Sequence, residues 1–385
     1  MSHTFRRAAV ALAVLALASG CAGEPAVQPP SAPLSTVPPT ELGDQVAKLR
    51  TSGDFVHDDT AVYMTKNESG LVALAIASGE QRWSVRFPDD GKPQDRSRPV
   101  LVTANGRPLV VQSYSASKPN RGTVAGYGYA GILAVDTGTG EVAWNTEFLK
   151  GERPSVELVG RGSTLAASWW VKGSESSAYS IADRTAAGVD VTTGAEKWRR
   201  DKFSPRAVDG DVVAGFATGQ AKPMALDATT GSPLWTIDKW LFNDKLTGAV
   251  PGRFLLVGLG LAQVLDSRTG KVLLDLPKDS YSDAVDAGDD VLLLHSAGSH
   301  MAGFDAKSLA KLWELPESGT GRVAPDGVGA AWRGTVYGRV SSQQIALEAR
   351  SGKEKPVTLS CMPTVLVPGY ALCGSSDLVV HTFEK

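Results

Sequence analysis

The sequence predicts an all-β fold, an eight-bladed β-propeller built from four-stranded antiparallel blades. Three observations lead to this prediction. A strand–turn–strand unit recurs seven times along the 385 residues, a tryptophan follows the turn at a constant distance in most copies, and the two ends of the chain carry the pieces of one further blade. A sustained period near forty residues with short strands is typical of propellers and disfavours isolated hairpins in a sandwich.

The repeat is clearest at residues 225–235, which read ALDATTGSPLW. Gly231 supplies the turn, because glycine takes positive φ without steric cost. Trp235 then begins a second strand with a large ring to bury. The same turn position is held, copy by copy, by Gly79, Gly140, Gly194, Gly231, Gly270, Leu309 and Gly352.

A tryptophan slot lies four residues after each turn position. It contains Trp83, Trp144, Trp198, Trp235, Leu274, Trp313 and Pro356. We therefore expect a distorted turn at Leu309 and weaker packing in the fifth and seventh copies. Most copies also carry an aspartate before the turn, where its side chain caps nearby backbone, so we interpret these carboxylates as structural. They are Asp136, Asp190, Asp227, Asp266 and Asp305.

The two ends of the chain predict the eighth blade. Residues 364–367, 370–374 and 378–383 read as three strands with no fourth strand after them, and residues 45–49 read as a lone strand ahead of the first repeat. We infer that this N-terminal strand completes the last blade, since closing the ring removes free sheet edges. The alternative is seven blades with the C-terminal strands paired elsewhere.

The first 21 residues predict a targeting segment. Arg6 and Arg7 precede an apolar stretch, residues 8–18, that is too short for a stable membrane span. Residues 17–21, LASGC, resemble a bacterial lipobox, which implies cleavage before Cys21 and diacylation of its thiol. The alternative is an ordinary secretory peptide cleaved nearby. One lipidated cysteine anchors a protein to a membrane without spanning it.

The remainder divides into a linker and one domain. Residues 22–42 contain six prolines, which predicts a flexible, extended spacer. Residues 43–385 form the propeller. We expect a monomer, held by its lipid at the outer face of the cytoplasmic membrane or in the cell envelope. The net charge of −2 and the lack of a basic block argue against a nucleic-acid partner.

Two cysteines remain besides Cys21. Cys361 and Cys373 flank a turn at residues 367–370, and in an oxidising compartment we expect them to form a disulfide that closes part of the last blade. The alternative is two buried free thiols. No metal site is predicted, because His295 and His300 have no acidic or cysteine companion.

The unit A-x-D-x-x-T-G-x-x-x-W, as at residues 225–235, closely resembles the pyrroloquinoline-quinone (PQQ) repeat of quinoprotein-alcohol-dehydrogenase-like propellers. The resemblance covers about residues 45–385. It implies that the five tryptophans of the repeat lie between adjacent blades and lock them. The family contains quinoprotein dehydrogenases and also non-enzymatic lipoproteins, such as the propeller subunit of the outer-membrane β-barrel assembly machinery, so the fold alone does not choose a function.

The sequence disfavours the enzymatic members of this family. Quinoprotein dehydrogenases carry a vicinal cysteine pair over the cofactor and Ca²⁺ ligands on long insertions, whereas no two cysteines are adjacent here. No Ser/His/Asp arrangement offers another chemistry. We therefore expect no cofactor and no catalytic residues. The alternative function is a small-ligand sensor, or a PQQ- and calcium-dependent redox enzyme, that uses the central channel.

Insertions in neighbouring blades suggest a protein-binding surface. They lie at residues 88–97, 114–129 and 172–185, and all three fall on one face of a standard propeller. Loops on a rigid scaffold are where binding concentrates, and tyrosine beside arginine is common at interfaces. The candidate partner-binding residues are Tyr114, Arg121, Tyr127 and Tyr129, with the loop Lys172–Thr185. The sequence thus predicts a membrane-anchored scaffold that binds another envelope protein.

Overall fold

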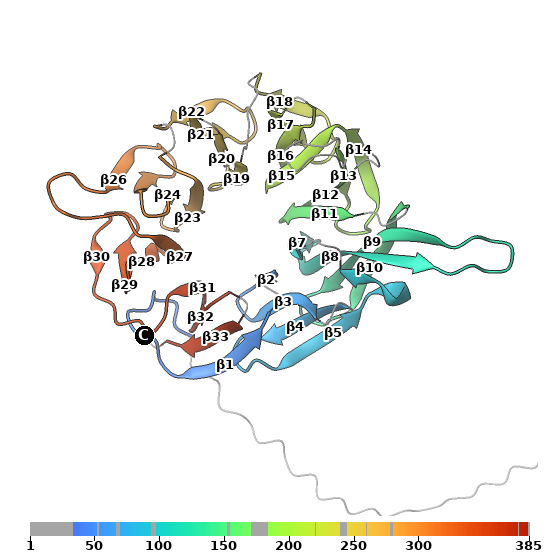
Figure 1. Ribbon diagram of the computed structural model, residues 1–385, viewed down its shortest axis with the longest axis horizontal. Coiled ribbons are helices and arrows are strands. Elements are labelled where there is room, and N and C mark those ends of the chain that lie inside the picture. The colour runs from blue at the N-terminus through green and yellow to red at the C-terminus, as the bar shows by residue number, and fades with distance from the viewer. Residues whose placement is uncertain are drawn as a thin grey trace, which may run out of the picture. The chain divides into compact units, whose positions relative to one another are not determined.

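The computed structural model forms a ring of eight antiparallel sheets, seen in Figure 1. It describes residues 34–51, 54–66, 70–93, 98–151, 155–170, 184–219, 221–238, 245–258, 260–277, 280–375 and 377–383. Seven sheets have four strands, and the second has a short fifth strand. The prediction of an eight-bladed propeller is confirmed.

The first four blades follow the chain in order, each from its inner to its outer strand. Blade 1 is β2 (Phe55–His57), β3 (Ala61–Lys66), β4 (Gly70–Ala75) and β5 (Gln81–Arg86). The 3₁₀ turn η1 (Pro88–Asp90) and the short strand β6 (Lys92–Pro93) lead to blade 2. Blade 2 is β7 (Val100–Ala104), β8 (Arg107–Lys118), β9 (Tyr127–Asp136) and β10 (Val142–Lys150). Blade 3 is β11 (Val156–Arg161), β12 (Thr164–Trp170), β13 (Arg184–Val189) and β14 (Glu196–Asp201); blade 4 is β15 (Phe203–Asp209), β16 (Val212–Ala217), β17 (Lys222–Asp227) and β18 (Pro233–Thr236).

The last four blades continue the ring. Blade 5 is β19 (Lys245–Gly248), β20 (Arg253–Gly258), β21 (Leu261–Asp266) and β22 (Val272–Asp275); blade 6 is β23 (Asp283–Asp286), β24 (Val291–Ser296), β25 (His300–Asp305) and β26 (Lys311–Leu315). Blade 7 is β27 (Gly327–Trp332), β28 (Thr335–Val340), β29 (Gln343–Glu348) and β30 (Glu354–Lys355); blade 8 is β31 (Pro363–Val367), β32 (Tyr370–Cys373), β33 (Asp377–Thr382) and, from the N-terminus, β1 (Gln45–Arg50).

The N-terminal strand closes the ring, as predicted. β1 pairs antiparallel with β33, with Ala47 opposite Val380 and Leu49 opposite Leu378. This pairing supplies the outer strand of blade 8 and excludes the seven-bladed alternative. The hydrophobic core is divided accordingly: eight apolar clusters each join one blade to the next, and one of them joins blade 8 to blade 1.

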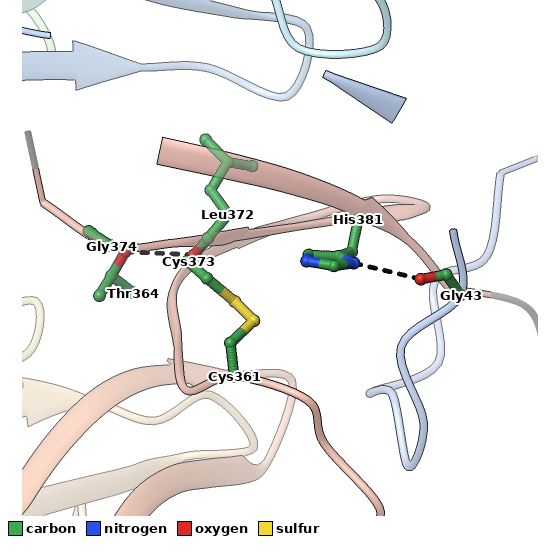
Figure 2. The surroundings of a disulfide bond; sticks show 7 residues. All are labelled: Gly43, Cys361, Thr364, Leu372, Cys373, Gly374 and His381. Atoms are coloured by element: carbon green, nitrogen blue, oxygen red, sulfur yellow. Dashed lines mark hydrogen bonds between the residues drawn. A yellow bond between two sulfur atoms is a disulfide. The ribbon is translucent and has the colours of Figure 1, made fainter. Parts of the chain in front are cut away.

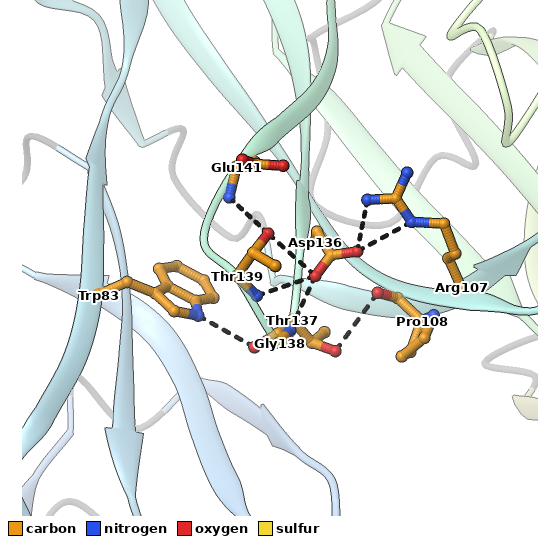
Figure 3. A network of polar contacts seen from close by, with 8 residues as sticks. All are labelled: Trp83, Arg107, Pro108, Asp136, Thr137, Gly138, Thr139 and Glu141. Carbon is orange, nitrogen blue, oxygen red and sulfur yellow. Dashed lines mark hydrogen bonds and ion pairs between the residues drawn. The ribbon is translucent and has the colours of Figure 1, made fainter.

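Tryptophans of the repeat connect five blades to their successors. In Figure 3, Trp83 of blade 1 donates its indole N–H to the carbonyl oxygen of Thr137 in the turn of blade 2, at 3.0 Å. The other four tryptophans make the same bond at 2.7–2.9 Å. Their acceptors are the carbonyl oxygens of Val191, Ala228, Ser267 and Ala349.

The turn glycine is required by this contact as well as by its backbone conformation. Gly231 has φ +70°, and a Cβ placed there would lie 2.7 Å from the ring of Trp198 in the preceding blade. The turns at Gly140, Gly194, Gly270 and Gly352 lie equally close to the preceding tryptophan. The glycine and the tryptophan of the repeat are therefore two halves of one inter-blade contact.

The sixth turn keeps its shape, so the expected distortion at Leu309 is wrong. Leu309 takes the left-handed conformation, with φ +57°, and its N–H donates to the carbonyl oxygen of Asp305 at 2.8 Å, as the glycines do in other copies. The preceding blade has Leu274 in the tryptophan slot, and Leu309 belongs to the same apolar cluster as Leu274. A side chain fits at this one turn because no indole covers it.

Aspartates of the repeat hold the turns together, consistent with a structural role. Asp227 Oδ1 accepts hydrogen bonds from the backbone N–H groups of Thr229 at 3.0 Å and Thr230 at 2.9 Å, and from the Thr230 hydroxyl at 3.1 Å. The bonds from Thr230 lower the pKa of the Asp227 carboxyl. Asp136 makes the same set in Figure 3 and also pairs with Arg107 at 2.9 Å.

The folded domain begins earlier than the sequence predicts. Residues 35–42, which we call the N-terminal strap, were expected to belong to a flexible linker, but they are bound to blades 7 and 8. The carbonyl oxygen of Ser35 accepts from Gly369 N–H at 2.8 Å, that of Pro39 accepts from the Tyr337 hydroxyl at 2.8 Å, and Leu42 is buried. These bonds and this burial offset the entropy of ordering a proline-rich segment.

A disulfide joins Cys361, which precedes β31, to Cys373 at the end of β32, with their Cα atoms 6.2 Å apart (Figure 2). Thr364 bonds the same hairpin through its hydroxyl, which donates to the carbonyl oxygen of Gly374 at 2.8 Å. At the other edge of blade 8, His381 Nδ1 lies 3.1 Å from the carbonyl oxygen of Gly43. Covalent and polar links therefore both reinforce the blade in which the ends of the ring meet.

The turn glycine provides a matched test of the inter-blade contact. We expect Gly231→Ala to lower the free energy of unfolding by about 1–3 kcal/mol more than Gly210→Ala, measured by urea denaturation. Both glycines have positive φ, but a Cβ at Gly210 meets no atom within 4 Å. Equal destabilisation by the two substitutions would contradict the steric role of Trp198.

The aspartate turns predict acid sensitivity. A carboxyl whose pKa is lower in the folded than in the unfolded state stabilises the fold while it is ionised. This stabilisation is complete above about pH 4, the unfolded pKa of aspartate, and is lost as the pH falls through the lower folded pKa. We expect Asp227→Asn to make the free energy of unfolding less pH-dependent below pH 4. An unchanged slope would contradict this role.

Candidate partner-binding site

The feature that departs most from a standard blade is a long hairpin in blade 2. β8 has 12 residues and β9 has 10, and they pair without interruption from Leu109 opposite Asp136 to Lys118 opposite Tyr127. Figure 1 shows this hairpin reaching beyond the rim of the ring. We call residues 115–129 the hairpin arm. The two ends of the stretch expected to be a loop, residues 114–118 and 127–129, are therefore strand.

The base of the hairpin arm is fixed by the buried ring of Tyr114. This ring stacks on Phe87 with 5.1 Å between centroids, and its hydroxyl donates to Asn145 Oδ1 at 2.7 Å. Across the strands, Gly131 leaves room for it, because a Cβ at Gly131 would lie 2.2 Å from the Tyr114 ring. The expectation that Tyr114 anchors a partner is wrong, since the ring is enclosed by the protein itself.

Tyr129 is the second aromatic of the base and is also buried. Its hydroxyl donates to Asp89 Oδ2 at 2.7 Å, which ties the connection from blade 1 to the hairpin arm. Burial and the hydrogen bond to Asp89 raise the pKa of Tyr129. The prediction that Tyr129 contacts a partner is therefore corrected as well: the residue stabilises the arm from inside.

Charged side chains of the neighbouring strand β10 hold the middle of the hairpin arm. Glu147 of β10 pairs with Lys118 and accepts a hydrogen bond from the Tyr127 hydroxyl at 2.9 Å. Lys150 lies over the Tyr127 ring, 4.7 Å from its centroid. Tyr127 is thus half-buried with its hydroxyl occupied. Sequence reasoning missed Glu147 and Lys150, since their pairing with the arm depends on the sheet register.

The tip of the hairpin arm is its exposed part. Arg121 and Val124 exchange backbone hydrogen bonds of 3.0 Å in each direction and close the turn. Both side chains are exposed, and Val124 is among the most exposed large hydrophobic residues described, at 66%. Of the four predicted partner-binding residues, Arg121 is therefore exposed, Tyr127 is half-buried, and Tyr114 and Tyr129 are buried.

The other two insertions are described only in part. Residues 88–93 fold back on the arm, where Pro93 of β6 pairs with Tyr114, while residues 94–97 lie outside the described residues. Of the loop Lys172–Thr185, all but Arg184 and Thr185 lies outside them too. Those two residues are buried in β13.

A charge cluster lies where blades 3 and 4 adjoin. Arg184 forms two bonds to the carboxylate of Glu157, at 2.6 and 3.0 Å, and its guanidinium lies 3.8 Å from the centroid of the Trp170 ring. Burial, and then the positive charge of Arg184, lower the pKa of Arg206. The adjoining hollow is about 140 Å³, whereas ligand pockets begin near 300 Å³. This hollow does not fit a quinone cofactor.

Within the described ranges, no group of three His, Cys, Asp or Glu side chains is placed to hold a metal ion. Among these same residues, no helix is long and apolar enough to cross a membrane.

A match to a family model identifies the family of this chain. A family model described as outer membrane protein assembly factor BamB matches residues 40–161 and 182–357. The chain belongs to this family. The match covers most of the chain and spans the tryptophan slots from blade 1 to blade 7. No curated protein matches the chain in sequence.

Solved structures agree with the BamB-like fold. BamB from Moraxella catarrhalis is 15% identical with a TM-score of 0.50, covering 89% of this chain and 100% of that one. The computationally designed Ika8 protein is 12% identical with a TM-score of 0.52, covering 90% and 99%. The C-terminal WD40 domain of Sif2 is 11% identical with a TM-score of 0.54, also covering 90% and 99%. At such identities the likeness shows the fold alone.

Proposed function

We propose that this BamB-family protein is a lipid-anchored envelope scaffold, without enzymatic activity, that binds another protein through the hairpin arm of blade 2. The observation that carries the proposal is the arm itself, a paired hairpin that extends beyond the ring and ends in an exposed tip. Membership of a family described as an assembly factor supports a protein partner.

Rigidity makes the hairpin arm suitable for binding. Two buried tyrosines fix its base, and the contacts of Glu147 with Lys118 and Tyr127 fix its middle. The base and middle of the arm are therefore already ordered in the unbound protein. A preorganised element loses less entropy when it binds and so retains more of its contact energy. Strands that served only to pack within blade 2 would not need to extend beyond it.

The exposed tip offers the chemistry of a small interface. Val124 supplies apolar area and Arg121 supplies a planar cation that can pair with a carboxylate or stack on an aromatic ring.

The start of the chain supports the anchor: Cys21 follows an apolar stretch and a lipobox-like sequence. A lipid at Cys21 would tether the propeller to a membrane.

Charge reversal at the tip tests the binding role. We expect Arg121→Glu to reduce in-cell cross-linking from a photoreactive residue at position 123 by at least about tenfold, the scale of an interface hot spot. The melting temperature should not change, because the tip supports no other element. Arg161→Glu, an exposed arginine of blade 3, is the matched control. Cross-linked products that are the same in both variants would contradict the proposal.

Lipidation has a separate test. We expect the wild-type protein to take up radiolabelled palmitate and to remain with the membrane fraction, and Cys21→Ala to lose the label and appear in the soluble fraction. Palmitate labelling that persists in Cys21→Ala would contradict the anchor. Because this experiment does not involve blade 2, it separates failure of the anchor from failure of the arm.

A further inference from the structure

Blade 7 departs from the other repeats at one backbone position. In repeats 1 to 6, the residue two before the one opposite the tryptophan slot either pairs with the outer strand of its blade or accepts a backbone hydrogen bond from the residue just after that strand. These residues are Leu71, Ile132, Ala186, Pro223, Ala262 and Met301. In blade 4, for example, the carbonyl oxygen of Pro223 accepts from Ile237 N–H at 2.9 Å. Gln344 occupies this position in blade 7.

The outer strand of blade 7 stops before it reaches Gln344. β30 has two residues and pairs only with Ala346 and Leu347, and Pro356 follows it directly. A proline has no N–H and does not continue a strand ladder. Thr358 lies as far after its turn glycine, Gly352, as Ile237 lies after Gly231, so the two positions correspond. The N–H of Thr358, however, donates to the carbonyl oxygen of Thr40 in the N-terminal strap, at 2.8 Å. The strap therefore binds the Thr358 N–H, which would otherwise donate to the carbonyl oxygen of Gln344.

The backbone groups of Gln344 point toward this uncovered side. β28 and β29 are joined by a two-residue turn, so Val340 and Gln343 form the closing hydrogen-bonded pair. Hydrogen-bonded and non-bonded pairs alternate along an antiparallel ladder, which turns the N–H and C=O of Gln344 away from β28. Among the described residues, no strand pairs with Gln344 on that side.

A groove of about 350 Å³ lies beside this edge. It is lined by residues 343–345 of β29, by Thr40 and Glu41 of the strap, and by residues 354–358. This volume falls in the range of binding pockets. The lining is mainly polar, with Gln343 and Gln344 on one side, which suits a peptide backbone better than an apolar ligand.

We propose that this groove, the blade 7 groove, binds an extended segment of another polypeptide, which adds as a strand to β29. The free groups are one backbone donor and one backbone acceptor on a sheet edge, and these are what β-strand addition uses for affinity. The segment would stand where six other repeats have their own outer strand. This site is separate from the hairpin arm, because it lies in a different blade and shares none of its residues.

The backbone of Gln344 can be tested without changing the fold. Gln344→Pro removes the N–H, and the equivalent position of blade 4 already holds a proline, Pro223. Gln344→Ala is the matched control, since it removes the side chain and keeps the N–H. The probe is a fluorescein-labelled, end-capped peptide of alternating threonine and valine between terminal lysines, and binding to the full-length protein is followed by anisotropy.

We expect saturable binding to the wild-type protein and to Gln344→Ala, and at least about fivefold weaker binding to Gln344→Pro, as for the loss of one backbone hydrogen bond. The amide of Gln344 should exchange with deuterium more slowly when the peptide is bound. No binding to the wild type, or equal binding to Gln344→Pro at an unchanged melting temperature, would overturn the proposal. Arg121→Glu must bind the peptide normally, which keeps this result independent of the hairpin arm.

Discussion

The contact between a tryptophan of one blade and the turn of the next is the interaction on which this ring depends. Its three parts are an indole that donates to a turn carbonyl, a glycine that lets the indole approach, and an aspartate that holds the turn, as at Trp198, Gly231 and Asp227. The glycine is required where an indole lies against the turn. Blade 5 and blade 6 show this clearly, because the loss of the indole at Leu274 coincides with a side chain at Leu309.

Closure of the ring depends on segments that are distant in the sequence. β1 completes blade 8, the N-terminal strap binds Tyr337 and Gly369, and a disulfide reinforces the hairpin of β31 and β32. The same strap diverts Thr358 from β29. The element that secures the end of the ring therefore also leaves the edge of blade 7 uncovered, and this links the closure of the fold to the blade 7 groove.

The proposed functions rest on the difference between a repeated scaffold and its departures. Where the repeat is regular, its polar groups are occupied by the fold, and the aspartates are an example. In the hairpin arm the strands are longer than in the other blades, and at the blade 7 groove the outer strand has only two residues. A rigid ring positions both without further ordering, which is the physical advantage of a propeller as a platform for binding.

The sequence by itself determined the number of blades, the closing strand, the inter-blade tryptophans and the structural aspartates, because each follows from a repeated local pattern or from the strand patterns at the two ends of the chain. It did not determine which tyrosines of blade 2 are exposed. Tyr114 and Tyr129 are buried by Phe87, Asn145 and Asp89, which come from other strands and connections. The order of the N-terminal strap and the uncovered Gln344 likewise depend on contacts between segments some three hundred residues apart. Only tertiary structure decides such features, since strand register and long-range burial leave no periodic signal in the chain.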